Sequence, residues 1–384
     1  MRILFYCRNY NEIIKNLQPW HYIIRLAEGL ALKGHNVSFV SSARHKFIIY
    51  NFKRQDDLSI AMIENGILEN KEEFADFISK ERIGIIITSI GPLSSLKRNE
   101  FNQFNGLCIG IVTFPLYKLR EILNAGFLLL FREWRNSYQH FFGAIIQSIS
   151  IKKWKKGFDL IIAESEHNRK EMIRKGIDPN RILLLRPGVD NIFLKNSSFT
   201  PIKSETDKRI IIYMGSPNRL RGAQDLISIW SNITRVDKRA RLRLLIRQDE
   251  NSGNETSILK TATKRDNRIE IITENLTRGE IKRHFSEASA IVFPFRLVPS
   301  EMPVGPLEAI SSGCRIIVPE LDGLSELREF GAMVYPPGDL EALANMIIYS
   351  ISDSISTRIP DKRELPSWHD ISCDLERHLF TISD

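Results

Sequence analysis

The stretch Ile210–Gly222 reads IIIYMGSPNRLRG and is the part of the sequence that best indicates the fold. Its unbroken apolar run is typical of a buried parallel strand, which ends at Gly215. Arg219 and Arg221 stand in the loop that follows, and Gly222 opens a helical pattern. Glycine at such a turn lets backbone N–H groups approach a phosphate, and an arginine fork matches phosphate oxygens. The stretch predicts a phosphate-binding strand–turn–helix unit, although an ordinary turn with solvated arginines fits the same residues.

Apolar runs alternate with amphipathic helical patterns on both sides of this stretch. The other expected strands are Arg2–Tyr6, Val37–Val40, Gly84–Thr88, Leu107–Thr113, Leu160–Ala163, Arg241–Ile246, Ile269–Ile272, Ala290–Phe293 and Arg315–Val318. The expected helices are Trp20–Lys33, Lys71–Lys80, Glu166–Lys175, Ala223–Ile233, Arg278–Glu287, Leu307–Ser311 and Leu340–Ser350. This alternation in 384 residues predicts two doubly wound α/β domains, with a ligand cleft at the carboxyl ends of their strands.

The second informative stretch is Pro299–Gly313, which reads PSEMPVGPLEAISSG. Its prolines stiffen the loop, Gly305 permits close backbone approach, and the helix is expected to begin near Pro306. Glu308 then lies in the first helical turn, where it either accepts hydrogen bonds from two sugar hydroxyls or serves only the helix end. Glu301, seven residues earlier, is expected to face a sugar held above the helix.

Charge is unevenly distributed along the chain. The net charge is +8, and the segment from Pro115 to Gly157 has eight basic and two acidic residues, a net charge of +6. This excess implies an anionic membrane, a phosphate or a nucleic acid as partner, but no nucleic-acid-binding motif surrounds it. The segment also carries Leu116, Leu119, Ile122, Leu123, Phe127–Phe131, Trp134, Phe141, Phe142 and Trp154. We expect a helix pair on an anionic membrane near a lipid-linked acceptor, with a core helix whose outer face is solvated as the alternative.

The remaining composition excludes several classes of protein. With 43% apolar and 26% charged residues, the chain is typical of a folded protein and not of a disordered one. The cysteines form no C-x-x-C pair, so we expect reduced thiols and neither a disulfide framework nor a zinc site; they are Cys7, Cys108, Cys314 and Cys373. No apolar run approaches the roughly 20 residues that span a bilayer. We expect a cytoplasmic protein that lies peripherally on the inner face of the cell membrane.

Four motifs, in this linear order, resemble the family 4 group of retaining GT-B glycosyltransferases, also described as glycosyl transferases group 1. They are the run Asp159–Phe193, which ends in RPGVDNIF; YMGSPNRLRG; PSEMPVGPLEAISSGCRIIVPELDGLSEL; and VYPPGDLEAL (Val334–Leu343). The resemblance covers Asp159 to the end, and the first 115 residues only in their alternation of strands and helices. It implies a GT-B fold, in which two Rossmann-like domains face a cleft and a last helix, Trp368–Phe380, crosses back to the first domain.

The resemblance and the loss of periodicity near residue 200 divide the chain into four parts. Residues 1–197 are expected to form an acceptor-binding Rossmann-like domain, and residues 198–208 a polar linker. Residues 209–367 are expected to form a nucleotide-sugar-binding Rossmann-like domain. Residues 368–384 are expected to form the helix that packs back on the first domain.

In function, the resemblance implies a retaining hexosyltransferase that uses a UDP- or GDP-linked sugar as co-substrate and needs no cofactor. Arg221 matches the basic residue on the diphosphate and Glu308 the carboxylate on the ribose, and we expect Arg221 and Glu301 to be catalytic. The other expected donor-binding residues are Gly215, Ser216, Arg219, Gly222, Ser300, Val304, Gly305, Pro306 and Leu307. The departing phosphate would accept the acceptor's proton, so no protein base is essential. The chain has no D-x-D pair, so no metal is expected, since arginines can stabilise the diphosphate charge.

The donor motifs depart from the family pattern at two places. Ser216 stands where an arginine is usual, so Arg219 is the candidate substitute. Six residues separate Glu301 from Glu308 where seven are usual, which puts Ser300 at the aligned position.

The first domain departs further from the pattern. It lacks the glycine pair after the first strand, where Leu17–His21 stands, and the histidine expected in VTFPLY (Val112–Tyr117). His21 and His140 are candidate replacements on the acceptor side, with structural histidines as the alternative. Two other functions stay open, a sugar-nucleotide epimerase of the same architecture and a nucleotide-sugar-binding protein that has lost catalysis.

Overall fold

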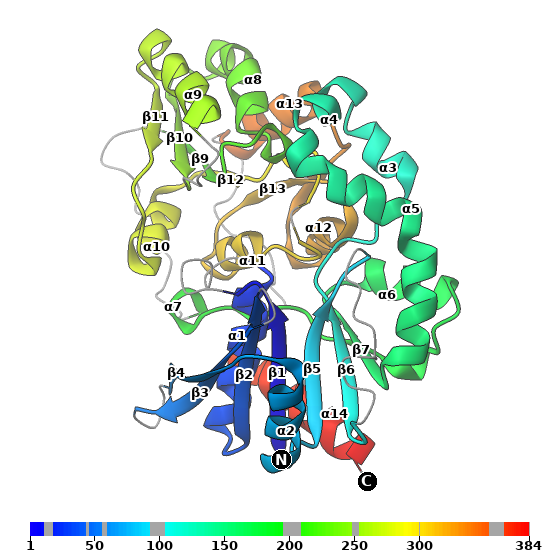
Figure 1. Cartoon of the computed structure of the whole chain (residues 1–384). Coiled ribbons are helices and arrows are strands. Elements are labelled where there is room, and N and C mark those ends of the chain that lie inside the picture. Colours follow the sequence, from blue (N-terminus) through cyan, green and yellow to red (C-terminus); the bar gives the residue numbers. More distant parts are fainter. Residues whose placement is uncertain are drawn as a thin grey trace.

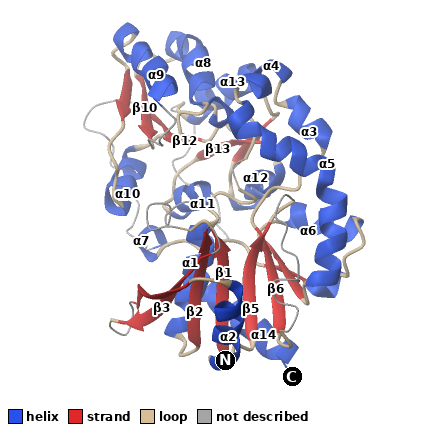
Figure 2. Ribbon diagram, viewed as in Figure 1, coloured by secondary structure: helices blue, strands red, loops and turns tan. Residues whose placement is uncertain are grey.

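The computed structural model describes residues 1–10, 18–43, 46–55, 60–92, 104–194, 209–247, 253–298, 300–352 and 365–383. Two α/β domains, each built on its own sheet, lie one beyond the other along the molecule (Figure 1). Figure 2 shows that helices flank the strands of both sheets. The predicted linker at residues 198–208 and the domain boundaries beside it lie outside the described residues and stay predictions.

The first domain has an eight-stranded sheet in the order β4-β3-β2-β1-β5-β6-β7-β8. Its six parallel strands are β1 (Arg2–Arg8), β2 (Asn36–Ala43), β5 (Ile85–Ile90), β6 (Leu107–Val112), β7 (Leu160–Ala163) and β8 (Ile182–Leu184). The antiparallel strands β3 (Lys46–Arg54) and β4 (Ile60–Leu68) extend one edge, and the sequence analysis did not predict them. Its helices are α1 (Trp20–Leu32), α2 (Lys71–Lys80), α3 (Leu119–Asn124), α4 (Phe127–Arg132), α5 (Trp134–Gly157), α6 (Glu166–Arg174), α7 (Asn191–Leu194) and the 3-10 helix η3 (Pro179–Arg181).

The second domain has a six-stranded, entirely parallel sheet in the order β11-β10-β9-β12-β13-β14. The strands are β9 (Arg209–Gly215), β10 (Ala240–Ile246), β11 (Ile269–Ile272), β12 (Ala290–Val292), β13 (Ile316–Pro319) and β14 (Met333–Tyr335). Its helices are α8 (Ala223–Val236), α9 (Gly253–Arg265), α10 (Arg278–Glu287), α11 (Val304–Ser311), α12 (Asp322–Ser325), α13 (Leu340–Ser350) and the 3-10 helices η4 (Arg219–Arg221) and η5 (Glu326–Phe330). This is the strand order of dinucleotide-binding folds, in which the order of successive strands reverses between β9 and β12, so a crevice is expected there.

The last helix, α14 (Trp368–Ser383), returns to the first domain and packs against α1. Gly29 of α1 lies so close to Ser372 that no side chain fits there. Gly188 is equally confined, since an added Cβ would lie 2.6 Å from the Trp368 nitrogen. Figure 1 shows both chain ends on the same end of the first domain. The predicted fold class, two Rossmann-like domains with a returning last helix, is therefore confirmed.

The basic segment forms three helices, α3, α4 and α5, in place of the predicted helix pair. Figure 1 shows them running along one side of the molecule from the first domain to the second. Tyr117, Ile122 and Leu130 belong to one apolar cluster with Phe293 of the second domain and its neighbours. Leu116, Ile122 and Trp154, which the sequence analysis placed on a membrane-facing surface, are buried in the core, Leu116 from the loop before α3 and the other two from the inner sides of α3 and α5.

Two further predictions concern the whole chain. None of the four cysteines, all of which the structure describes, forms a disulfide, and Cys7, Cys108 and Cys314 are buried. Among the described residues, no helix combines the length and the apolar character that crossing a membrane requires.

Candidate active site

The turn after β9 is fixed by local contacts. The Tyr213 hydroxyl donates to the Ser216 carbonyl oxygen at 2.5 Å, and the Asn218 side chain caps η4 by accepting from the Leu220 N–H at 2.8 Å. Gly222 has φ +81°, and an added Cβ would collide with the Pro294 carbonyl oxygen. Only glycine satisfies both conditions, so β9 and the segment after β12 approach each other through this residue.

Arg221 is held at the edge where β9 and β12 end. Its Nη1 donates to the Leu297 carbonyl oxygen at 2.9 Å, and its guanidinium carbon lies 5.8 Å from the centre of the Phe295 ring. Arg219, two residues earlier on η4, turns instead toward the first domain, with its Nε 4.0 Å from the Glu133 carboxylate. The two arginines that the sequence placed in one loop therefore have different surroundings.

The helix α11 begins at Val304, so the predicted start near Pro306 or Leu307 is too late by two or three residues. Pro303 is the N-cap, and Pro306 occupies the third helical position, where a missing N–H breaks no helical hydrogen bond. A helix start leaves four N–H groups without a partner in the helix. Pro303 and Pro306 have no N–H, so only the N–H groups of Val304 and Gly305 are present here. Gly305 packs on β9, because an added Cβ would lie 3.0 Å from the Met214 methyl group. The helix start thus presents two donors beside the Arg221 turn.

Glu308 is buried in the second turn of α11, one turn later than predicted. Arg278, the first residue of α10, donates through Nη1 to its carboxylate at 3.2 Å and pairs with it again through Nη2. Burial raises the pKa of Glu308 to about 7, and the Arg278 charge limits that rise. Arg278 therefore fixes the position of the Glu308 carboxylate. The ribose-binding role that the resemblance implied for Glu308 stays a prediction.

Arg278 also connects Glu308 to the first domain. Its Nη2 lies 2.7 Å from the Asp190 carboxylate, which in turn pairs with Nη2 of Arg25 on α1 at 3.0 Å. Burial alone would raise the pKa of Asp190, but the two arginines outweigh it and the pKa is lowered. His21 lies near this network, and burial lowers its pKa to about 4, with the charge of Arg25 adding to the effect. His21 is thus neutral at physiological pH.

Glu301 points into the first domain. Its Oε1 accepts hydrogen bonds from the N–H of Ser165 at 2.6 Å and from the Ser165 hydroxyl at 2.8 Å. Glu164 is also fully buried beside it, and burial together with the Glu301 charge raises the pKa of Glu164 well above its usual range. Burial raises the pKa of Glu301 to about 8, against the opposing effect of the Ser165 hydroxyl. Glu301 therefore forms a contact between the domains in this structure, and its catalytic role stays a prediction.

The raised pKa of Glu301 predicts how the free energy of unfolding depends on pH. The folded chain holds a proton on Glu301 up to a pH of about 8, whereas an unfolded glutamate loses it near about 4.3. The contribution of Glu301 to stability is therefore greatest below the unfolded pKa and is lost as the pH rises toward 8, by up to about 1.4 kcal/mol per pH unit. We expect Glu301→Gln, which keeps the acceptor oxygen, to flatten this slope in urea unfolding curves recorded between pH 6 and 9.

The matched control is Glu320→Gln, which changes an exposed carboxylate of the same domain. It is expected to keep the wild-type slope, because exposed pairs contribute little. Identical slopes for all three proteins would show that Glu301 is charged in the folded chain.

His140 comes from α5 to the loop that lacks the family's histidine. Its ring stacks on Phe114 with centroids 4.7 Å apart and meets Tyr117 edge-on at 5.5 Å. Burial lowers the pKa of His140 to about 3, and the charge of Arg221 adds to the effect. The structure thus brings a neutral imidazole from the first domain near Arg221, and its acceptor-side role stays a prediction.

The sequence analysis missed several residues of this site. Asp190, Arg278 and the pair Glu164–Ser165 were given no role, although Asp190 lies in the quoted RPGVDNIF motif. Ser216 and Ser300, both predicted donor contacts, are buried, and the Ser300 hydroxyl has no hydrogen-bond partner among the described residues. Among the predicted donor-binding and catalytic residues, the structure brings five together at the edge of the second sheet where β9 and β12 end: Gly215, Arg221, Gly222, Val304 and Gly305.

Comparison with known proteins bears on the second domain most directly. The sequence profile of the family described as glycosyl transferases group 1 matches residues 208–353. The resemblance to glycosyl transferases group 1 is confirmed there, while the family 4-like retaining subclass stays a prediction. A search of curated proteins by sequence finds no match.

Solved structures resemble the chain over its whole length. Sucrose-phosphate synthase from Thermosynechococcus elongatus is 16% identical with a TM-score of 0.70, and the alignment covers 100% of both chains. Alr3699/HepE from Anabaena, solved with UDP and glucose, is 12% identical with a TM-score of 0.65 over 99% of both chains. The lipopolysaccharide outer core galactosyltransferase WaaB is 12% identical with a TM-score of 0.60, covering 98% of this chain and 95% of its own. The chain therefore has the GT-B fold.

Proposed function

We propose that the protein moves a sugar from a nucleotide diphosphate sugar to an acceptor hydroxyl, with retention of the anomeric configuration. One observation carries the proposal: the Arg221 turn and the start of α11 meet at the edge where β9 and β12 end. In open parallel sheets, ligands bind at the point where the strand order reverses. The family match over residues 208–353 supports the same assignment.

The chemistry requires charge stabilisation at the diphosphate. When the bond from the anomeric carbon to the phosphate oxygen breaks, the diphosphate gains negative charge. Arg221 and the N–H groups of Val304 and Gly305 are donors fixed in place before the reaction, which is the arrangement that stabilises such charge best. In the retaining reaction, the departing phosphate oxygen takes the proton of the acceptor hydroxyl on the same face, so no protein base is required. Glu308, in the second turn of α11, would accept hydrogen bonds from the ribose hydroxyls, a role that the motif resemblance implies.

The donor nucleotide is the first property to test. UDP is the leading candidate because Alr3699/HepE, which shares the fold, was solved with UDP, and GDP is the alternative. Thermal unfolding of the full chain should shift upward with one nucleotide family among UDP, GDP, ADP and their sugar conjugates. Ligand at a hundredfold excess over Kd adds about 2.7 kcal/mol of apparent stability. No shift with any nucleotide would contradict the proposal.

Retention is tested separately from binding. The anomeric configuration of the product, read from proton NMR coupling during transfer, should match that of the donor sugar. Conversion of the donor into a second nucleotide sugar would instead identify an epimerase. Binding with neither transfer nor donor hydrolysis would identify a protein that has lost catalysis.

We further propose that the acceptor is lipid-linked and that the surface of α3, α4 and α5 lies on an anionic membrane. On α4, Phe127, Leu128 and Phe131 are 71%, 76% and 73% exposed. Further exposed apolar residues on these helices are Leu119, Leu123, Trp134, Phe142, Ile145 and Ile149, with exposed basic residues at Arg120, Arg132, Lys152 and Lys153. Exposed aromatic rings beside basic side chains are typical of helices that lie in the plane of a charged membrane surface.

Vesicle flotation tests this surface. Wild-type chain should bind phosphatidylglycerol-containing vesicles, more weakly at high salt, and bind pure phosphatidylcholine poorly. The double change Phe127→Ser/Phe131→Ser should lower partitioning on the order of 100-fold, since each buried phenylalanine contributes about 1.5 kcal/mol or more. The matched control, Ile63→Ser/Ile67→Ser, alters two exposed residues on β4 and should bind like wild type. Equal binding by both double variants would contradict the membrane assignment.

A further inference from the structure

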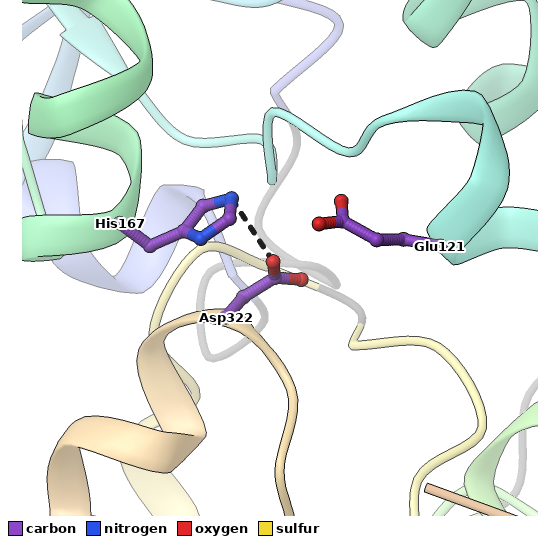
Figure 3. Close-up of side chains that lie close together, drawn as sticks. All are labelled: Glu121, His167 and Asp322. Atoms are coloured by element: carbon purple, nitrogen blue, oxygen red, sulfur yellow. Dashed lines mark ion pairs between the residues drawn. The ribbon is translucent and has the colours of Figure 1, made fainter.

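Three metal-ligating side chains meet where the two domains touch. Glu121 comes from α3 and His167 from α6, both in the first domain, and Asp322 is the first residue of α12 in the second. One ligand atom of each lies within 4.8 Å of those of the other two. Figure 3 shows the three side chains pointing toward one another from separate elements.

The contacts within this cluster leave ligand atoms unsatisfied. His167 Nε2 lies 3.1 Å from Asp322 Oδ1, yet within the described part of the chain it makes no hydrogen bond. Asp322 is 4% exposed; the Tyr117 hydroxyl interacts with its carboxylate, but its buried Oδ2 makes no hydrogen bond of good geometry among the described residues. Buried polar atoms are normally hydrogen-bonded, so the ion pair between His167 and Asp322 leaves both side chains able to take a further partner. A cation between the imidazole and the carboxylates supplies that partner to both at once.

The surroundings hold the ligands in position. The N–H of His167 donates to Glu326 Oε1 at 3.0 Å, which fixes the start of α6 against the second domain. Glu121 accepts from the Lys118 N–H at 2.7 Å through Oε2, which leaves Oε1 for another partner. The Lys118 ammonium group pairs with Glu171 at 3.2 Å. The positive charge of Lys118 is therefore balanced by Glu171 and not by Glu121.

We propose that Glu121, His167 and Asp322 bind one divalent transition-metal ion, with zinc the best fit, and that this ion joins the two domains. One imidazole and two carboxylates suit zinc, which takes nitrogen and oxygen ligands and completes its shell with water. Magnesium is disfavoured because it prefers oxygen ligands and keeps its own water. This site differs in kind from a metal–diphosphate bridge, which the sequence analysis did not expect, since its ligands come from both domains and include no D-x-D pair.

The test is zinc binding by the full chain after treatment with EDTA. Titration calorimetry with zinc chloride should give one ion per chain, with magnesium chloride giving none. His167→Gln and Asp322→Asn keep the side-chain size and should each weaken zinc binding at least about 10-fold. Cobalt, used as a spectroscopic probe, should show a visible absorption band in wild type that both variants lose.

The matched control is His35→Gln. His35 also pairs with a carboxylate, Glu376 at 2.7 Å, but that carboxylate pairs with Lys33 at 2.8 Å. Zinc binding by His35→Gln should equal that of wild type, with the cobalt band retained. Absence of stoichiometric binding in wild type, or unchanged binding in His167→Gln, would overturn the proposal. Because no nucleotide is present in these measurements, their failure is separate from any failure of the proposed glycosyl transfer.

Discussion

Arg221→Ala is expected to lower kcat for sugar transfer, or for donor hydrolysis without acceptor, by about 100- to 1000-fold. Arg221 stands between the ends of β9 and β12, fixed by its hydrogen bond to Leu297 and by the Phe295 ring. A donor that is in place before charge develops stabilises the transition state without reorganisation, and its removal costs that amount in known enzymes. Steady-state kinetics with the nucleotide sugar identified by thermal shift measures the effect. Affinity for the nucleoside diphosphate should fall by about 1.5–3 kcal/mol, since a hydrogen bond to a charged group is lost.

The comparison with Arg328→Ala separates this effect from general damage. Arg328 is an arginine of the same domain that is 61% exposed and pairs with Glu320. Its replacement should leave kcat and nucleotide affinity unchanged. If Arg221→Ala retained wild-type kcat, the diphosphate would have to be held elsewhere and the assignment of this turn would be wrong.

Arg278→Met is expected to lower the free energy of unfolding by about 3 kcal/mol near pH 8. The change removes the cation that Glu308 and Asp190 share across the two domains. Asp190 keeps Arg25, but Glu308 is left buried without a counter-charge. Breaking one side of a buried pair costs about 3–5 kcal/mol, and the lower value applies because the Arg278 side chain is 41% exposed. Urea unfolding measures the loss.

The loss should be smaller at pH 6. Glu308 has a raised pKa, about 7, so it takes up a proton more readily than an ordinary carboxylate and is neutral when the pH is low. A neutral carboxyl group needs no counter-charge when it is buried. The control Arg328→Met should cost no more than about 1 kcal/mol at either pH, as exposed ion pairs do. A loss that does not change between pH 6 and pH 8 would show that Glu308 keeps its charge without Arg278.

Elements with strong periodicity were predictable from the sequence. The helix α10 was predicted with its observed bounds, Arg278–Glu287, because its capping residue and amphipathic pattern are local signals. The strand β4 was missed because it lies at the sheet edge with most of its residues partly or fully exposed, which leaves no buried apolar run. The start of α11 was placed too late because a proline within the first turn looks the same in sequence as one at the first position.

The site was predictable only where its residues are close in sequence. Gly215, Arg221 and Gly222 belong to one turn, so their grouping follows from a single motif. Asp190 and Arg278 are 88 residues apart, and no local pattern indicates that two domains bring them together. The same limit applies to His140, whose place beside Phe114 depends on how α5 packs. Glu301 was predicted from its motif, but the partner that it contacts, Ser165, belongs to the other domain.

The two prolines at the start of α11 also determine what anion binding costs in conformational entropy. Pro303 and Pro306 fix two φ angles in the segment that would receive the diphosphate. A flexible loop loses about 1–2 kcal/mol per residue when it becomes ordered around a ligand, whereas these residues are already restricted in the unbound chain. The two prolines therefore remove two N–H donors from the helix start and make its backbone more rigid. We expect nucleotide binding here to show a smaller entropic penalty than binding to a glycine-rich loop of the same length.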